Sequence, residues 1–284
     1  MRFAKEELKD YPVSEVCRVL GVSRSEYYRE SAKGDSEKTA EEMAVIHCFH
    51  AHNRNYGRIR IKKELAKVNI ELSEYRISRI LKANGLVAKG GHPHNGKRSR
   101  KTEKQYVEEN LIKDKFSITS ANYLWCSDIT ELEYKHGKLY LCGVLDVATR
   151  RVVGWSKDRH QRQSLVQDAF RMAVGRNPER PKNAVFHSDR GSQYTAKKTK
   201  ELVEKAGFKR SMSRPGTPSD NQPIESFWHT LETELGPLTD CNYEQACAKI
   251  ESYIEMYYNS SRMHSGIAYY IPNELFTLLT VSHS

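Results

Sequence analysis

The sequence predicts an α/β protein: a mixed five-stranded sheet with flanking helices, preceded by small all-α modules. Before residue 89 the apolar residues recur mainly with helical spacing, and from about residue 118 strand-like runs alternate with helical ones. A length of 284 residues corresponds to about two domains, and 38% apolar residues suffice for a core.

The chain is basic, with a net charge of +10 and a pI near 9.2. This charge favours a polyanion such as nucleic acid as partner, although a membrane surface or simple solubility also accounts for a basic chain. No run approaches 18 apolar residues, so we expect no membrane partner and a cytoplasmic location. The six cysteines form no Cys-x-x-Cys pair and are expected to be reduced core residues.

The first module, residues 1–34, carries two short helical patterns between residues 12 and 33. Gly21-Val22 separates them, and Ser23-Arg-Ser-Glu26 forms a capping box before the second. This pattern predicts a helix-turn-helix, with a plain helical hairpin as the alternative.

The second module, residues 35–88, resembles a further helix-turn-helix. Its first helix is expected over about 37–51, with these residues along one face: Ala40, Met43, Ala44 and Ile46. A helix from about Ser73 to Asn84 turns apolar residues toward the core and Arg76 and Arg79 away from it. We expect both arginines to contact DNA, because an arginine-bearing helix after a turn suits the major groove; simple solvation of the helix is the alternative.

Residues 89–117 are predicted to be a basic linker. Six basic residues and three glycines lie within 89–104, without apolar periodicity. A flexible basic segment can follow a phosphate backbone, so four of these residues are expected DNA contacts: Lys97, Arg98, Arg100 and Lys101.

The segment 118–236 contains the predicted sheet. Three hairpin-linked strands come first, at 123–134, 139–147 and 151–156. The remaining elements are a helix (162–175), a strand (184–188), a helix (195–206), a strand (208–212) and a helix from about 221. The order β-β-β-α-β-α-β-α is that of the RNase H fold, and residues 237–284 form a C-terminal helical extension.

Three acids occupy informative places in this order: Asp128 on the first strand, Asp189 after the fourth and Glu225 in the first turn of the last helix. They are expected to converge at one sheet edge. Three carboxylates suit a hard cation such as Mg²⁺, and two such ions about 4 Å apart clamp the attacking and leaving oxygens of a phosphodiester. The structural alternatives are an ion pair, a loop cap and a helix-dipole carboxylate, respectively.

Asp146 competes for the first position, but capping of the following turn is the favoured interpretation. His187, Asn221 and His229 are expected to line the site. Neither histidine is required as a base, because metal-activated water needs no protein base.

Two segments resemble signatures of DDE transposases with a retroviral-integrase-type core: His187-Ser-Asp-Arg-Gly-Ser-Gln-Tyr194 and Asp220-Asn-Gln-Pro-Ile-Glu-Ser-Phe-Trp228. The chain is similar over nearly its whole length to the second reading frame of the insertion-sequence-three family. Further residues carry that resemblance: Asn55-Tyr-Gly57, Tyr258-Asn259, Arg262, His264 and Pro272.

The resemblance implies that Asp128, Asp189 and Glu225 are a catalytic triad binding Mg²⁺ (or Mn²⁺), with two ions expected. It implies DNA partners, namely the terminal inverted repeats of the element and target DNA, with Arg262 as a further DNA contact. It also implies a homo-oligomer on DNA, a fusion with an upstream reading-frame product and a bacterial, nucleoid-associated location.

One position departs from the family pattern. The family usually has Lys or Arg seven residues after the catalytic Glu, where the side chain reaches DNA, and this chain has Glu232. The sequence predicts a transposase, and the alternatives are a DNA-binding regulator with an inert catalytic domain and an RNase H-like nuclease that cuts without strand transfer.

Overall fold

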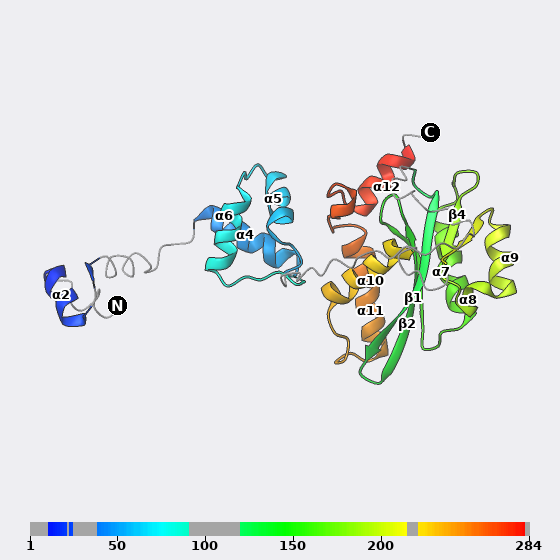
Figure 1. Cartoon of the computed structure of the whole chain (residues 1–284), viewed down its shortest axis with the longest axis horizontal. Coiled ribbons are helices and arrows are strands. Elements are labelled where there is room, and N and C mark those ends of the chain that lie inside the picture. Colours follow the sequence, from blue (N-terminus) through cyan, green and yellow to red (C-terminus); the bar gives the residue numbers. More distant parts are fainter. Residues whose placement is uncertain (1–10, 22, 25–38, 91–119, 215–220, 282–284) are drawn as a thin grey trace. The chain divides into compact units, whose positions relative to one another are not determined.

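The computed structural model describes residues 11–21, 23–24, 39–90, 120–214 and 221–281 (Figure 1). The chain divides into two compact units, residues 1–88 and 89–284, and each is described by itself. In the first unit α2 (Val13–Leu20) ends at Gly21, as the sequence of residues 12–33 predicts. The second helix of that module lies outside the described residues.

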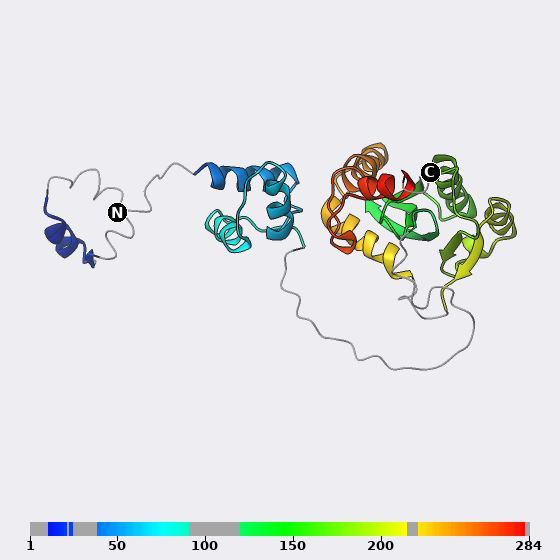
Figure 2. The same cartoon turned by 90° about the horizontal axis from the view of Figure 1, so that it is seen from above.

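Three further helices of the first unit pack together: α4 (Ala40–Ala51), α5 (Arg58–Ala66) and α6 (Glu74–Ala83) (Figure 2). Thr39 and Ser73 cap α4 and α6 by accepting hydrogen bonds from backbone N–H groups three residues on. The predicted apolar contacts of α6 are confirmed, because Ile77, Ile80 and Leu81 are buried.

One expectation for this unit was wrong, and one of its helices was not predicted. The buried face of α4 consists of Val45, Cys48 and Phe49, while Met43 is exposed. The apolar residues of α4 are spread around much of its circumference, so its sequence does not determine which face is buried. Helix α5 was not predicted; it is charged and short, and only Ile61 and Leu65, four residues apart, anchor it in the core.

The second unit contains the predicted mixed sheet. Its five strands are β1 (Leu124–Tyr134), β2 (Gly137–Asp146), β3 (Val152–Asp158), β4 (Val185–Ser188) and β5 (Lys209–Met212). Their order in space is β3-β2-β1-β4-β5. The first three strands pair antiparallel, and β4 pairs parallel to β1 and to β5. The predicted RNase H-like order is confirmed.

Helices cover both faces of this sheet (Figure 1). On one face lie α7 (Gln163–Arg176), α8 (Ser192–Thr195) and α9 (Lys197–Lys205). Gly154 of β3 permits the close approach of α7, since a Cβ there would lie 2.4 Å from the carbonyl oxygen of Ala169. On the other face lie α10 (Gln222–Leu235) and α11 (Tyr243–Ser252).

The C-terminal extension shares the core of the sheet. After α11 come a π-helix, η2 (Tyr253–Tyr258), a 3₁₀ turn, η3 (Ser265–Ile267), and α12 (Pro272–Val281). Ile250, Ile254 and Tyr258 are buried in the same apolar cluster as Leu139 and Leu141 of β2. The extension is therefore part of the folding unit that carries the sheet.

Two expectations from composition concern the interior and the membrane. All six cysteines are buried and unpaired, as predicted for reduced core residues. Within the described ranges no helix is both long and apolar enough to cross a bilayer.

Candidate active site

Asp128 lies in the middle of β1, where it pairs with Gly143 of the antiparallel strand β2. On its other side β1 runs parallel to β4, and the last paired residues are Ser127 and Ser188. Asp189 follows Ser188 directly, so Asp128 and Asp189 are the residues that follow the last pair of these two neighbouring strands. The sheet topology alone therefore places the first two acids at the same edge of the sheet.

Glu225 reaches the same edge on the first turn of α10. Asn221, at the start of this helix, donates from Nδ2 to the backbone oxygen of Ser127 at 3.2 Å. Further along the helix, Trp228 donates from Nε1 to Oδ2 of Asp128 at 3.0 Å. These two hydrogen bonds hold α10 against β1 on either side of Glu225.

Asp128 interacts electrostatically with the other two carboxylates. Burial raises the pKa of Asp128 to about 6, and the negative charges of Asp189 and Glu225 add to this rise. Hydrogen bonds from the Ile129 backbone and from Trp228 oppose it. Partial burial also raises the pKa of Glu225. A cation placed among the three acids relieves this repulsion, so the all-oxygen donor set suits a hard divalent metal.

The three acids do not form a closed metal-binding site in this structure. Among the residues that the structure describes, no three His, Cys, Asp or Glu side chains are grouped closely enough to bind one metal ion. Asp189 uses Oδ1 to accept a hydrogen bond from the Gly191 backbone at 3.0 Å, so the loop-capping alternative describes a real contact of this side chain.

A buried polar network supports the loop after Asp189. The hydroxyl of Tyr194, on α8, lies 3.0 Å from the hydroxyl of Ser127, the residue before Asp128.

Asp146 is buried and accepts hydrogen bonds from the backbone N–H groups of Asn122 and Thr149, both at 3.0 Å. The capping interpretation of Asp146 is therefore confirmed.

The three expected site-lining residues have different places. His187 is fully buried, and its ring nitrogens lie 2.9 and 3.0 Å from the hydroxyls of Ser211 and Ser213. It joins β4 to β5 and does not line an open site, which corrects the expectation. Asn221 is buried and positions α10, while His229 is exposed one turn after Glu225.

The expectation that Arg262 contacts DNA was wrong. Its side chain is 5% exposed, and its guanidinium makes three hydrogen bonds of 2.7 to 2.9 Å with the carboxylate of Glu234 on α10. Burial by itself lowers the pKa of Arg262. The hydrogen bonds and the negative charge of Glu234 raise the pKa by more than burial lowers it, so the guanidinium stays charged. Arg262 fastens the C-terminal extension to α10.

The neighbouring late residues have similar structural contacts, which the sequence did not reveal. The side-chain amide of Asn259 donates to the Val152 carbonyl and accepts from the Val152 N–H, both at 3.0 Å. His264 accepts the Gly266 N–H at Nδ1, also at 3.0 Å. These contacts could have been inferred from the polar residues in an otherwise apolar segment, because buried polar groups need hydrogen-bond partners.

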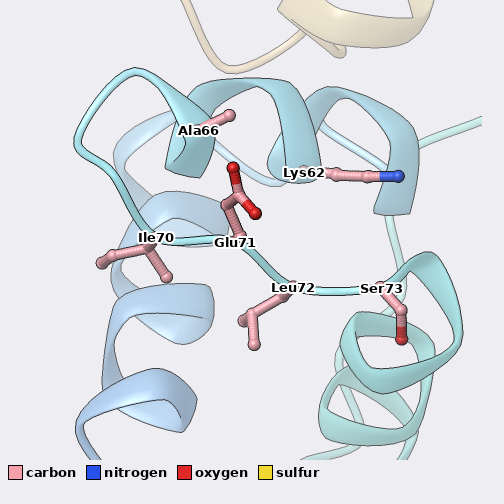
Figure 3. Close-up of a pocket in the computed structure, with 6 residues that line it drawn as sticks. All are labelled: Lys62, Ala66, Ile70, Glu71, Leu72 and Ser73. Carbon is pink, nitrogen blue, oxygen red and sulfur yellow. The ribbon is translucent and has the colours of Figure 1, made fainter.

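In the first unit Arg76 and Arg79 are exposed on α6, as expected. Arg76 lies 3.7 Å from the Glu41 carboxylate, and Arg79 stacks over the exposed ring of Tyr75. A cavity of about 440 Å³ lies beside the connection between α5 and α6 (Figure 3). Its lining residues are Lys62, Ala66, Ile70, Glu71, Leu72 and Ser73. They include none of the three acids.

Comparison with known proteins identifies the class of this fold and site. Models described as "Integrase core domain" match residues 119–218 and 206–272, and one described as "HTH-like domain" matches residues 36–93. The second unit is therefore an integrase-type catalytic domain, with carboxylates from β1, from the end of β4 and from α10.

Relatives specify the class further. The chain is 35% identical to the transposase for insertion sequence element IS904 of Lactococcus lactis, over 87% of this chain and 97% of that one. It is 30% identical to transposase InsF for insertion sequence IS3A of Escherichia coli, over 93% of each. The chain belongs to the insertion-sequence-three family of transposases. It is a DDE transposase that binds DNA and catalyses metal-dependent strand cleavage and strand transfer.

Solved structures of viral integrases are more distant. A simian T-cell lymphotropic virus intasome covers 82% of this chain and 73% of its own, with a TM-score of 0.47 and 14% identity. An HTLV-2 integrase catalytic core domain in complex with magnesium covers 55% of this chain and 97% of its own, with a TM-score of 0.43 and 18% identity. The family assignment does not depend on them.

Proposed function

We propose that Asp128, Asp189 and Glu225 are the catalytic triad of this transposase and hold two Mg²⁺ or Mn²⁺ ions. The observation that carries this proposal is the placement of the three acids at one edge of the sheet: Asp128 lies on β1, Asp189 directly follows the β4 residue that pairs with Ser127, and Glu225 lies in the first turn of α10. When bound, such ions activate water and stabilise the charge on the phosphodiester oxygens. The chain supplies the oxygen ligands, and its sheet and α10 hold them in place.

The proposed DNA substrates are the terminal inverted repeats of the element and a target duplex. The experiment is a reaction of the purified chain with element-end DNA and Mg²⁺ or Mn²⁺, in which cleaved and joined products are separated. Joined products support a transposase, cleavage alone supports a nuclease, and end binding without cleavage in either metal supports an inert regulator.

The assembly is also part of the proposal. Two element ends have to be held together for joining, so we infer a homo-oligomer on DNA. We further propose a fusion with an upstream reading-frame product and association with the bacterial nucleoid. Arg76 and Arg79 on α6 are the proposed base-reading or phosphate-contacting residues of the HTH-like domain, because both are exposed on one helix.

The linker residues Lys97, Arg98, Arg100 and Lys101 lie outside the described residues, and we propose that they contact phosphates. Replacing all four by glutamine is expected to lower the slope of log affinity against log salt by roughly 3 to 4, at about 0.9 per lost contact. Fluorescence anisotropy with element-end DNA measures this slope. The control replaces four exposed lysines of α9: Lys197, Lys198, Lys200 and Lys205. An unchanged slope in the linker variant rejects the contact.

Glu232 shares the exposed face of α10 with Glu225 and His229, at spacings of seven and three residues. A carboxylate there repels a phosphate backbone that approaches the triad. We expect Glu232→Lys to bind element ends several-fold more tightly at low salt and to steepen the salt slope by about 0.9. Glu201→Lys on α9 makes the same charge change at another exposed site. Equal gains in both variants would show that net charge alone is responsible.

A further inference from the structure

Trp228 occupies a notch in the sheet that only a glycine leaves open. Gly143 of β2 is the cross-strand partner of Asp128, and a Cβ at Gly143 would lie 2.8 Å from Cη2 of the Trp228 ring. Real Cβ atoms do not approach other atoms so closely, so any side chain at Gly143 would displace the indole. The ring is therefore seated directly beside the first acid of the triad.

The same ring makes a directed contact with that acid. Trp228 is 6% exposed, and its only polar group, the Nε1–H, donates to Oδ2 of Asp128 at 3.0 Å. Trp228 also stands three residues after Glu225, so it belongs to the turn that follows the third acid. One side chain thus connects the strand that carries Asp128 to the helix that carries Glu225.

Packing alone does not require this arrangement. A phenylalanine would fill most of the notch, but it has no donor for a partly buried carboxylate that two other acids repel. A hydrogen bond to a charged acceptor is stronger than a neutral one and fixes the orientation of the carboxylate. Asn221 holds the start of the same helix, but its contact is with the backbone of Ser127 and not with the Asp128 carboxylate.

We propose that Trp228 is a positioning residue of the metal site. Its indole holds the Asp128 carboxylate in one orientation and sets the distance between β1 and α10, which prepares the acids for a divalent cation. This inference rests on the proposed triad. It predicts that Trp228 acts through metal affinity, whereas a residue that only packs would act through stability.

The chain contains its own matched control. Trp155 of β3 also donates from Nε1 to a carboxylate, that of Glu255, at 2.7 Å, and it is equally buried at 5% exposure. Trp155→Phe and Trp228→Phe therefore remove the same kind of hydrogen bond while keeping an aromatic ring. Only the second touches an acid of the triad.

The experiment measures Mn²⁺ binding to the full chain without DNA, by electron paramagnetic resonance of free Mn²⁺. Urea unfolding of each variant and the Mg²⁺ dependence of strand transfer accompany it. Trp228→Phe is expected to weaken Mn²⁺ binding roughly ten-fold, the lower end of the range for residues that orient metal ligands, and saturating metal is expected to restore most of the strand-transfer rate. Trp155→Phe is expected to keep wild-type Mn²⁺ affinity. Gly143→Ala, which keeps the indole but displaces it, is expected to weaken Mn²⁺ binding as well.

The outcomes separate the two proposals. If Asp189→Asn loses Mn²⁺ binding while Trp228→Phe and Gly143→Ala both bind it as tightly as wild type, the positioning role is rejected and the triad stands. The same holds if weaker binding in Trp228→Phe is matched by Trp155→Phe. If Asp189→Asn binds Mn²⁺ as well as wild type, the triad assignment itself fails, and the role of Trp228 fails with it.

Discussion

Asp189→Asn is expected to abolish strand transfer on element-end DNA, by a factor on the order of 10³ or more. Metal ions supply several kcal/mol of transition-state stabilisation, and about 1.4 kcal/mol corresponds to ten-fold in rate. Asparagine keeps the size of the side chain and the oxygen that accepts the Gly191 N–H, but it removes the negative charge that a divalent cation requires. Strand transfer is measured at saturating Mg²⁺ and again with Mn²⁺.

Measuring DNA binding distinguishes a loss of catalytic activity from a loss of folded protein. The HTH-like domain covers residues 36–93, whereas Asp189 belongs to the catalytic unit, so the variant is expected to bind element ends like wild type. Asp168→Asn is a suitable control, because Asp168 is an exposed acid on α7 whose partner is Arg171. Strand transfer at a wild-type rate by Asp189→Asn would remove Asp189 from the triad.

Arg262→Ala is expected to reduce the free energy of unfolding by about 3–5 kcal/mol, the range for removing one partner of a buried ion pair. The change leaves the Glu234 carboxylate buried at 8% exposure, with Tyr253 as its remaining hydrogen-bond donor at 3.0 Å. Urea unfolding followed by circular dichroism measures the loss. The salt slope of DNA binding is expected to stay at the wild-type value, because the guanidinium faces the protein interior.

Two further variants test the cause of this loss. The double change Arg262→Met with Glu234→Gln removes both charges and keeps an acceptor for Tyr253, so it is expected to be more stable than Arg262→Ala. Arg171→Ala breaks the exposed pair with Asp168 and is expected to cost about 1 kcal/mol or less. If Arg262→Ala costs no more than Arg171→Ala, the buried pair does not anchor the C-terminal extension. A lowered salt slope in Arg262→Ala would instead restore the original expectation of a DNA contact.

Much of the catalytic domain was readable from local patterns. Strands β1, β2 and β3 are runs of apolar or alternating residues between turns. Their order along the chain with α7, α9 and α10 is enough to identify the fold. The places of Asp128, Asp189 and Glu225 followed from that order, because parallel neighbours such as β1 and β4 bring their ends to one edge. By contrast, α4 is apolar around much of its surface, and its buried face could not be chosen from sequence.

The sequence by itself determined the fold class, the three acids and the family, because strand and helix periods and short signatures are local properties of the chain. The tertiary structure decided which polar residues are exposed and which hold the protein together. Arg262 pairs with Glu234 across 28 positions, and Trp228 meets Asp128 across 100 positions. Such contacts depend on packing between distant elements, which local sequence patterns do not reveal. Arg262, expected on DNA, therefore proved to be buried in an ion pair, and Trp228 proved to donate a hydrogen bond to Asp128.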